Sequence, residues 1–258
     1  MGLSKYSIGI GDRFGHQGRA QLDALITAGK QGIEITPVWN KSFREHKTIG
    51  SLPTDTRLAA NLAVKSKNWI KPYLVDADHI SLITVDGFLH SSDFFTMDVA
   101  DEIGKPVDDE KIREFIQFCE RFTRSFKITG IDEEIAVDHS VVRKMANQYL
   151  AGVLEAEKIY QHIMAQRPTP FVLELSIDET EYPQQPIDLF FILAAVAWCR
   201  LPLDTIAPKF TGRFNKGVDY VGDIEQFARE FEKDVLVVKF AIQEFGLPSN
   251  FKTECPFG

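Results

Sequence analysis

Short apolar stretches alternate with longer amphipathic stretches along most of the chain. Strand-like segments occupy residues 6–10, 33–38, 73–79, 171–177 and 203–208. Between the first two, apolar residues recur at helical spacing, as at Leu22, Leu25 and Ile26. Strands that alternate with helices indicate parallel βαβ units.

Residues 84–170 interrupt this alternation. Two apolar stripes at helical spacing run through this segment, one from Ile112 to Phe126 and one from Val142 to Ile163. Phe94, Phe95 and Met97 are interpreted as core residues. We therefore predict a helical insertion near 84–170.

Polar residues gather directly after the predicted strands, at 11–17, 39–46, 76–79, 174–179 and 209–216. Barrels and open α/β sheets both place their chemistry at the carboxyl ends of parallel strands. Five strands and a stub near 251–258 do not close an eight-stranded barrel. The pattern alone leaves both architectures open.

Composition narrows the class of protein. The chain has 258 residues, 44% of them hydrophobic, and a net charge of −8. An acidic surface repels phosphate backbones, so we expect no nucleic-acid partner. No apolar signal region opens the sequence, and a membrane span needs about 20 apolar residues, which no stretch provides. Three Cys without a CxxC spacing favour reduced thiols. We predict a cytoplasmic, soluble protein without a membrane partner.

A glycine-rich turn, residues 9–15, follows the first strand and precedes a helix. It resembles a dinucleotide fingerprint, with Glu34 near the expected acidic position. However, Phe14 occupies the place of the third glycine, and Arg13 and His16 crowd the loop. A tight turn that presents polar side chains is favoured, and the dinucleotide site remains an alternative.

Two acidic segments could carry chemistry. Asp76, Asp78 and His79 end the third strand, where strand alternation places the two carboxylates on one side and the imidazole on the other. Such a set can bind a divalent cation or transfer a proton, although a solvated turn is an equal alternative. Glu174 lies inside an apolar strand, where a carboxylate is costly unless it is paired or bound to a metal.

A basic loop stands out in this acidic chain. Lys209, Arg213 and Lys216 lie within eight residues after the fifth predicted strand. Cations at a strand end suit a small anionic ligand, and Arg13 could contribute from a neighbouring loop.

Four motifs occur in a fixed order: Gly9 to Gly15, Val75 to His79, Glu174 to Thr180, and Gly217 to Asp223. Together they resemble the tagaturonate epimerase family. The resemblance implies metal-dependent interconversion of D-tagaturonate and D-fructuronate, in hexuronate catabolism. It also implies an α/β fold, a parallel (β/α) barrel of TIM type.

Family members are longer and continue beyond the last residue of this sequence. We therefore expect one barrel-like domain over 1–258, incomplete at its C-terminus and truncated after about five or six strands. Whether this chain alone is active stays open, as does a homo-oligomeric state.

The resemblance and the residue chemistry together suggest roles. C4 is β to the C2 ketone, so its proton is not acidified, and retro-aldol cleavage followed by re-addition is the economical route. We assign Asp78 as base, Glu174 as acid or metal partner, and His79 as ligand of a divalent metal, for which manganese, zinc and iron all qualify. Substrate binding is assigned to Arg13, His16, Lys209 and Arg213.

Two other functions remain as alternatives. One is a dinucleotide-dependent sugar-acid oxidoreductase, which rests on the glycine-rich turn. The other is a non-catalytic protein or fragment that binds a sugar acid.

Overall fold

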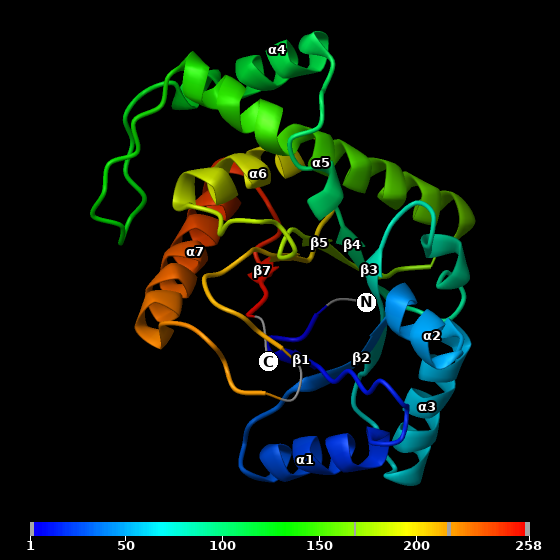
Figure 1. The fold of residues 1–258 in the computed structure, drawn as a ribbon. Coiled ribbons are helices and arrows are strands. Elements are labelled where there is room, and N and C mark those ends of the chain that lie inside the picture. Colours follow the sequence, from blue (N-terminus) through cyan, green and yellow to red (C-terminus); the bar gives the residue numbers. More distant parts are fainter. Residues whose placement is uncertain (1–2, 168, 216–217, 256–258) are drawn as a thin grey trace. The chain divides into compact units, whose positions relative to one another are not determined.

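Parallel strands in sequence order form the framework of the protein. The computed structural model describes residues 3–167, 169–215 and 218–255. Within these residues, seven strands form one sheet in the order β1-β2-β3-β4-β5-β6-β7 (Figure 1). The pairs β1–β2, β2–β3, β3–β4 and β6–β7 are parallel. The predicted α/β class is confirmed, and the strand order is consistent with part of a TIM-type barrel.

The chain divides into two compact units, each described by itself below. The first comprises Met1–Met97 and Ile159–Glu174, and the second Asp98–Lys158 and Leu175–Gly258.

The first part of the chain contains four strands and three helices before residue 100. They are β1 (Ser7–Gly9), α1 (Gly18–Lys30), β2 (Thr36–Ser42), α2 (Phe43–Ile49), α3 (Pro53–Ser66), β3 (Leu74–Ile80) and β4 (Phe94–Asp98). The remainder contains α4 (Asp109–Phe118), α5 (His139–Gln166), β5 (Val172–Ser176), α6 (Pro186–Trp198), β6 (Thr205–Ala207), α7 (Ile224–Phe245) and β7 (Lys252–Thr253). Single 3-10 turns lie at Val85–Gly87, Ala100–Glu102 and Glu120–Phe122.

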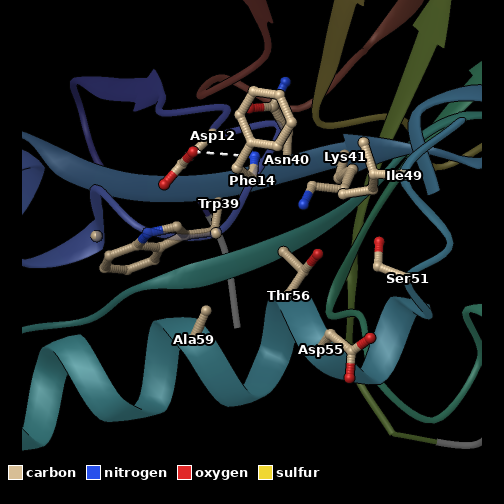
Figure 2. Close-up of a pocket in the computed structure, with 12 residues that line it drawn as sticks. Asp12, Phe14, Trp39, Asn40, Lys41, Ile49, Ser51, Asp55, Thr56 and Ala59 are labelled. Carbon is tan, nitrogen blue, oxygen red and sulfur yellow. Dashed lines mark hydrogen bonds between the residues drawn. The ribbon is translucent and has the colours of Figure 1, made fainter.

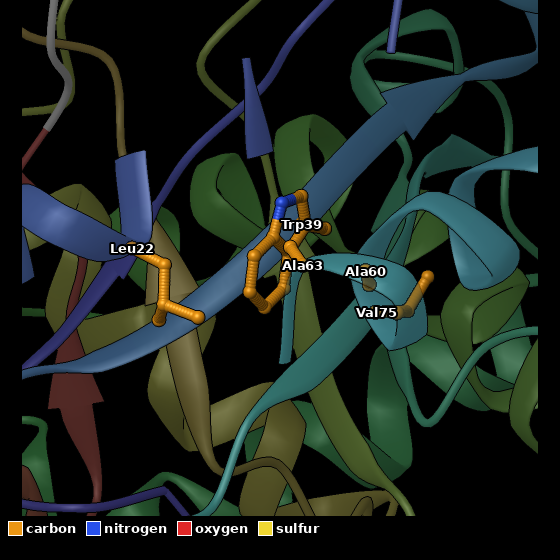
Figure 3. Close-up of a cluster of buried hydrophobic side chains, with 5 residues drawn as sticks. All are labelled: Leu22, Trp39, Ala60, Ala63 and Val75. Atoms are coloured by element: carbon orange, nitrogen blue, oxygen red, sulfur yellow. The ribbon is translucent and has the colours of Figure 1, made fainter. Parts of the chain in front are cut away.

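Helices α1 and α3 cover one face of β2 and β3. Figure 3 shows the packed side chains: Leu22 from α1, Trp39 from β2, Ala60 and Ala63 from α3, and Val75 from β3. All five are almost completely buried. The two alanines let α3 approach closely enough for the Trp39 ring to fill the space between the helices and the sheet.

The opposite face of the same strands begins with an apolar layer. Val38, Leu74, Phe94 and Val172 form a second buried cluster. Side chains alternate between the faces of a strand, so residues two positions further along lie on this same face. They are the polar residues that form the candidate site below.

Strand β4 corrects the interpretation of residues 84–170 as a helical insertion. The stripe from Val142 to Ile163 is confirmed as part of α5, whereas the stripe from Ile112 to Phe126 is α-helical only as far as Phe118, the end of α4. Phe94–Asp98 is a strand that pairs with β3. Residues 94–97 are buried on both faces, so the segment shows no polar alternation. A short, fully buried strand cannot be recognised by periodicity alone.

Strand β2 also differs from its predicted bounds. It runs to Ser42 rather than ending at residue 38, and Lys41 and Ser42 are buried although polar. The short helix α2 follows, and Ser42 caps it by accepting a hydrogen bond from the Glu45 backbone N–H at 3.2 Å.

The second unit has an aromatic core around α6. This helix is apolar along its length after the first turn, and residues Leu189 to Val196 are buried. The ring of Phe190 lies 4.9–5.7 Å from those of Phe122, Phe126, Phe240 and Phe245. None of the helices in the described residues is long and apolar enough to span a membrane.

Candidate active site

A polar layer follows the apolar layer on the same face of the first unit. Asn40 is in register with Asp76, and Thr96 and Glu174 come two positions after Phe94 and Val172. Asp76, Thr96 and Glu174 are 6%, 3% and 4% exposed. The carboxyl groups of Asp76 on β3 and Glu174 on β5 are thus both buried, on the two strands that flank β4.

The Thr96 hydroxyl lies between the two carboxyl groups. Its Oγ1 is 3.0 Å from Asp76 Oδ2 and 3.2 Å from Glu174 Oε1. A hydroxyl has one proton and can donate it to only one of these oxygens at a time. Thr96 therefore links the carboxyl groups of β3 and β5 from the strand between them. This fixes the position of Glu174, the predicted acid.

Asp78 and His79 form a contact at the end of β3. His79 Nδ1 lies 2.8 Å from Asp78 Oδ1, and both side chains are largely buried. The backbone of His79 has a left-handed φ of 51°, and the pairing with β4 shifts register between Ala77 and Ile80. Such a bulge redirects a side chain and is common next to active sites. Simple strand alternation therefore does not describe the position of His79.

The loop between β1 and α1 holds Arg13 and His16. Arg13 Nε is 3.5 Å from Glu45 Oε1, and its backbone carbonyl accepts a hydrogen bond from Lys41 Nζ at 2.8 Å. His16 is exposed. Asp12 accepts hydrogen bonds from the backbone amides of Phe14 and Gln17. These amides are engaged within the loop, which supports the tight-turn interpretation over a dinucleotide site.

Lys209 and Arg213 belong to the second unit, after β6. The Lys209 backbone N–H donates to Gln184 Oε1 at 2.6 Å, and its side chain is half-buried. Arg213 is exposed, and its backbone forms an antiparallel bridge with Val221. Lys216 and Gly217, which complete the basic loop and begin the last motif, lie outside the described residues.

The donor set for a metal ion is incomplete in the described part of the chain. There, no group of three or more His, Cys, Asp or Glu is close enough to hold a metal. The pair of Asp78 and His79 does have the carboxylate–imidazole arrangement that orients metal-binding histidines. These residues fit one ligand and its supporting partner, not a whole coordination sphere.

Sequence reasoning missed Thr96. The segment reads as core because of Phe94, Phe95 and Met97, and that interpretation is confirmed by their burial. The signal was a single hydroxyl among large apolar residues, on the third residue of its strand, as Asp76 and Glu174 are on theirs. Only the pairing of β3 with β4 brings this hydroxyl to the carboxyl group of Asp76.

Comparison with known proteins adds to this geometry. The model of the UxaE family, described as tagaturonate epimerase, matches residues 1–245. A tagaturonate/fructuronate epimerase of Thermotoga maritima is 28% identical over 241 residues, which cover 88% of this chain and 48% of that protein. The chain thus spans about half the length of this curated relative.

Solved structures show the same fold. A glycerol-bound crystal structure of the fructuronate-tagaturonate epimerase UxaE from Cohnella laeviribosi matches with a TM-score of 0.77 and 23% identity, covering 96% of this chain and 51% of that one. The native crystal structure of that enzyme matches with a TM-score of 0.73 over the same shares.

Proposed function

Because the chain belongs to the tagaturonate epimerase family, we propose that it carries catalytic residues for the interconversion of D-tagaturonate and D-fructuronate. The observation that carries the proposal is the buried pair Asp76 and Glu174, which Thr96 links. Asp76 lies two residues before Asp78 on β3. The proposed epimerisation requires one base and one acid, and carboxyl groups can serve as both.

The two ketouronates differ at C4, whose proton no adjacent carbonyl acidifies. We favour cleavage of the C3–C4 bond. A base removes the proton of the C4 hydroxyl, C4 becomes an aldehyde, and the bonding electrons pass to C3 and the C2 carbonyl as an enediolate. The aldehyde rotates, C3 attacks its other face, and an acid returns a proton to the C4 oxygen. Atoms and charge balance without an external oxidant.

The proposal assigns the base to Asp78 and the acid to Glu174. Asp78 is hydrogen-bonded to His79, so the imidazole holds its carboxylate in one orientation. Glu174 is held by Thr96 inside the sheet, where low dielectric makes its interaction with a developing alkoxide stronger than in water.

Arg13, His16, Lys209 and Arg213 remain the proposed substrate-binding residues. Cations bind a carboxylate by charge-assisted hydrogen bonds, and the uronate carboxylate needs such partners. His79 remains the proposed ligand of a divalent metal, which would supply Lewis-acid stabilisation of the C2 oxygen. The described residues provide only this part of its coordination, and the roles above are derived without it.

Turnover of D-tagaturonate by this chain tests the proposal. With a divalent cation present, NMR should detect D-fructuronate, and Glu174→Gln should lower the rate at least about a hundredfold, as expected for loss of a general acid. The control Glu181→Gln changes an exposed carboxylate seven residues further along the chain and should keep the rate.

The same samples separate the alternatives. Oxidation of NADH coupled to the substrate would favour the oxidoreductase. Saturable binding of D-tagaturonate without turnover would favour a binding protein.

A further inference from the structure

A cavity lies beside β2, lined mainly from the helix side of the strand and also by Asn40. Its volume is about 150 Å³. Figure 2 shows Thr56, Asp55 and Ala59 on the face of α3 that is turned toward β2, where Trp39 and Lys41 are drawn. The loop after β1 also contributes to its lining. A cavity of this volume holds a ligand of roughly six to eight non-hydrogen atoms.

Three residues that line this cavity have a buried polar atom without a hydrogen-bond partner among the described residues. One atom is Oδ1 of Asn40, and the other two belong to almost fully buried residues: Nε1 of Trp39, which is 3% exposed, and Oγ1 of Thr56, which is 8% exposed. Trp39 Nε1 lies beside Gly18, another lining residue, 3.4 Å from the position a Cβ would take there. Buried polar groups normally have partners, so these atoms mark places where a ligand can donate or accept a hydrogen bond.

The charges of the lining select against an anion. Asp12 and Asp55 carry two negative charges, and Lys41 carries one positive charge that is already directed to the Arg13 carbonyl. The carboxylates have acceptor capacity left, because each oxygen can accept more than one hydrogen bond. A neutral ligand with several hydroxyl groups suits this lining better than a carboxylate does.

The walls between the polar groups are apolar. Phe14, Trp39, Ile49 and Ala59 present rings and aliphatic groups. The C–H groups of a polyol can pack against them while its hydroxyls reach the polar atoms.

We propose that this cavity binds a neutral polyhydroxylated compound of three to four carbons. One ligand oxygen accepts the Trp39 indole N–H, and an adjacent hydroxyl pairs with Thr56. The site does not rest on the proposed epimerase activity, because it uses none of the residues assigned to acid, base or metal roles.

Titration with erythritol, followed by the indole N–H resonances of the three tryptophans, tests the site. Trp39→Phe assigns the Trp39 signal. That signal should move and saturate with a dissociation constant on the order of 1–10 mM, as a ligand this small allows. Erythronate, the matched carboxylate, should bind at least about fivefold more weakly.

Thr56→Val removes the hydroxyl and keeps the shape, and should weaken erythritol binding about fivefold. Thr54→Val, an exposed position on the same helix, should leave binding unchanged. Ala59→Leu, which narrows the cavity, gives an independent variant should Thr56→Val not fold by circular dichroism. Its binding should also be weaker.

Three results would overturn the proposal. The first is a Trp39 signal that does not saturate up to about 50 mM erythritol, as when water alone satisfies these groups. The second is erythronate binding as tight as erythritol binding. The third is an equal affinity for erythritol in the wild type and in every folded cavity variant.

Discussion

The Thr96 hydroxyl lies 3.2 Å from the carboxylate of Glu174, a residue 78 positions further along the chain. The same hydroxyl is 3.0 Å from Asp76. Neither carboxyl group is near the other in sequence, and a single buried oxygen joins them. Its removal is therefore the most direct test of how the candidate site is held together.

Thr96→Val should destabilise the protein by about 1–3 kcal/mol, because the isosteric change leaves buried carboxyl oxygens without this hydrogen bond. Urea unfolding measures the difference. Thr96→Ser retains the hydroxyl and should recover part of the loss. If the valine variant were as stable as wild type and the serine variant were not, packing rather than the hydroxyl would explain the position.

His79→Ala should weaken binding of Mn2+ or Zn2+ by about tenfold or more, the loss expected when one ligand of a partial site is removed. Isothermal titration calorimetry on the chain measures the affinity. The control is His139→Ala, at an exposed position on α5. Equal affinities for all three proteins would remove His79 from the metal proposal.

Asp234, in α7, links stability to pH. Burial, reinforced by Glu230, raises the pKa of this carboxyl to about 7. In the unfolded chain the group ionises near pH 4, so the free energy of unfolding falls as pH rises from about 4 to 7. Asp234→Asn should remove this loss of unfolding free energy, which is on the order of 4 kcal/mol at pH 8 and about 1 kcal/mol at pH 4.5.

Thermal unfolding at the two pH values measures the Asp234 effect. Glu232→Gln, an exposed change on the same helix, serves as the control. A stabilisation by Asp234→Asn that is the same at both pH values would contradict the assignment.

His46 gives the opposite dependence. Burial, with a contribution from Lys41, lowers its pKa to about 4. Nδ1 of the neutral ring lies 2.8 Å from Ser51 Oγ. Unfolded histidine binds a proton near pH 6.5, so stability should fall as pH drops from about 6.5 to 4.

The free energy of unfolding should fall less between pH 7 and pH 4.5 in His46→Gln than in the wild type. His139→Gln replaces an exposed histidine and should retain the wild-type slope. A His46→Gln slope equal to that of wild type would show that this imidazole does not titrate differently on unfolding.

Local patterns predicted much of the fold. The apolar stripe that predicted α5 recurs every three to four residues, so it depends only on residues within a few positions of each other. Strand β4 was not predictable in this way, because residues 94–97 are buried on both faces. They show neither the helical period nor the two-residue alternation of a half-buried strand.

The sequence by itself determined which residues are available for chemistry. Glu174 stands out because a carboxyl group in an apolar strand needs a partner. Asp78 and His79 stand out because acidic and imidazole groups follow buried residues at a strand end. These inferences use only the cost of burial and the alternation of side chains.

Tertiary structure decided which of these residues meet. Thr96 gains its role from the pairing of β3 with β4, and the bulge at His79 sets an orientation that alternation does not predict. The cavity beside Trp39 likewise needs β2, α3 and the loop after β1 together. Such contacts depend on strand register and helix packing between distant segments, which no local pattern specifies.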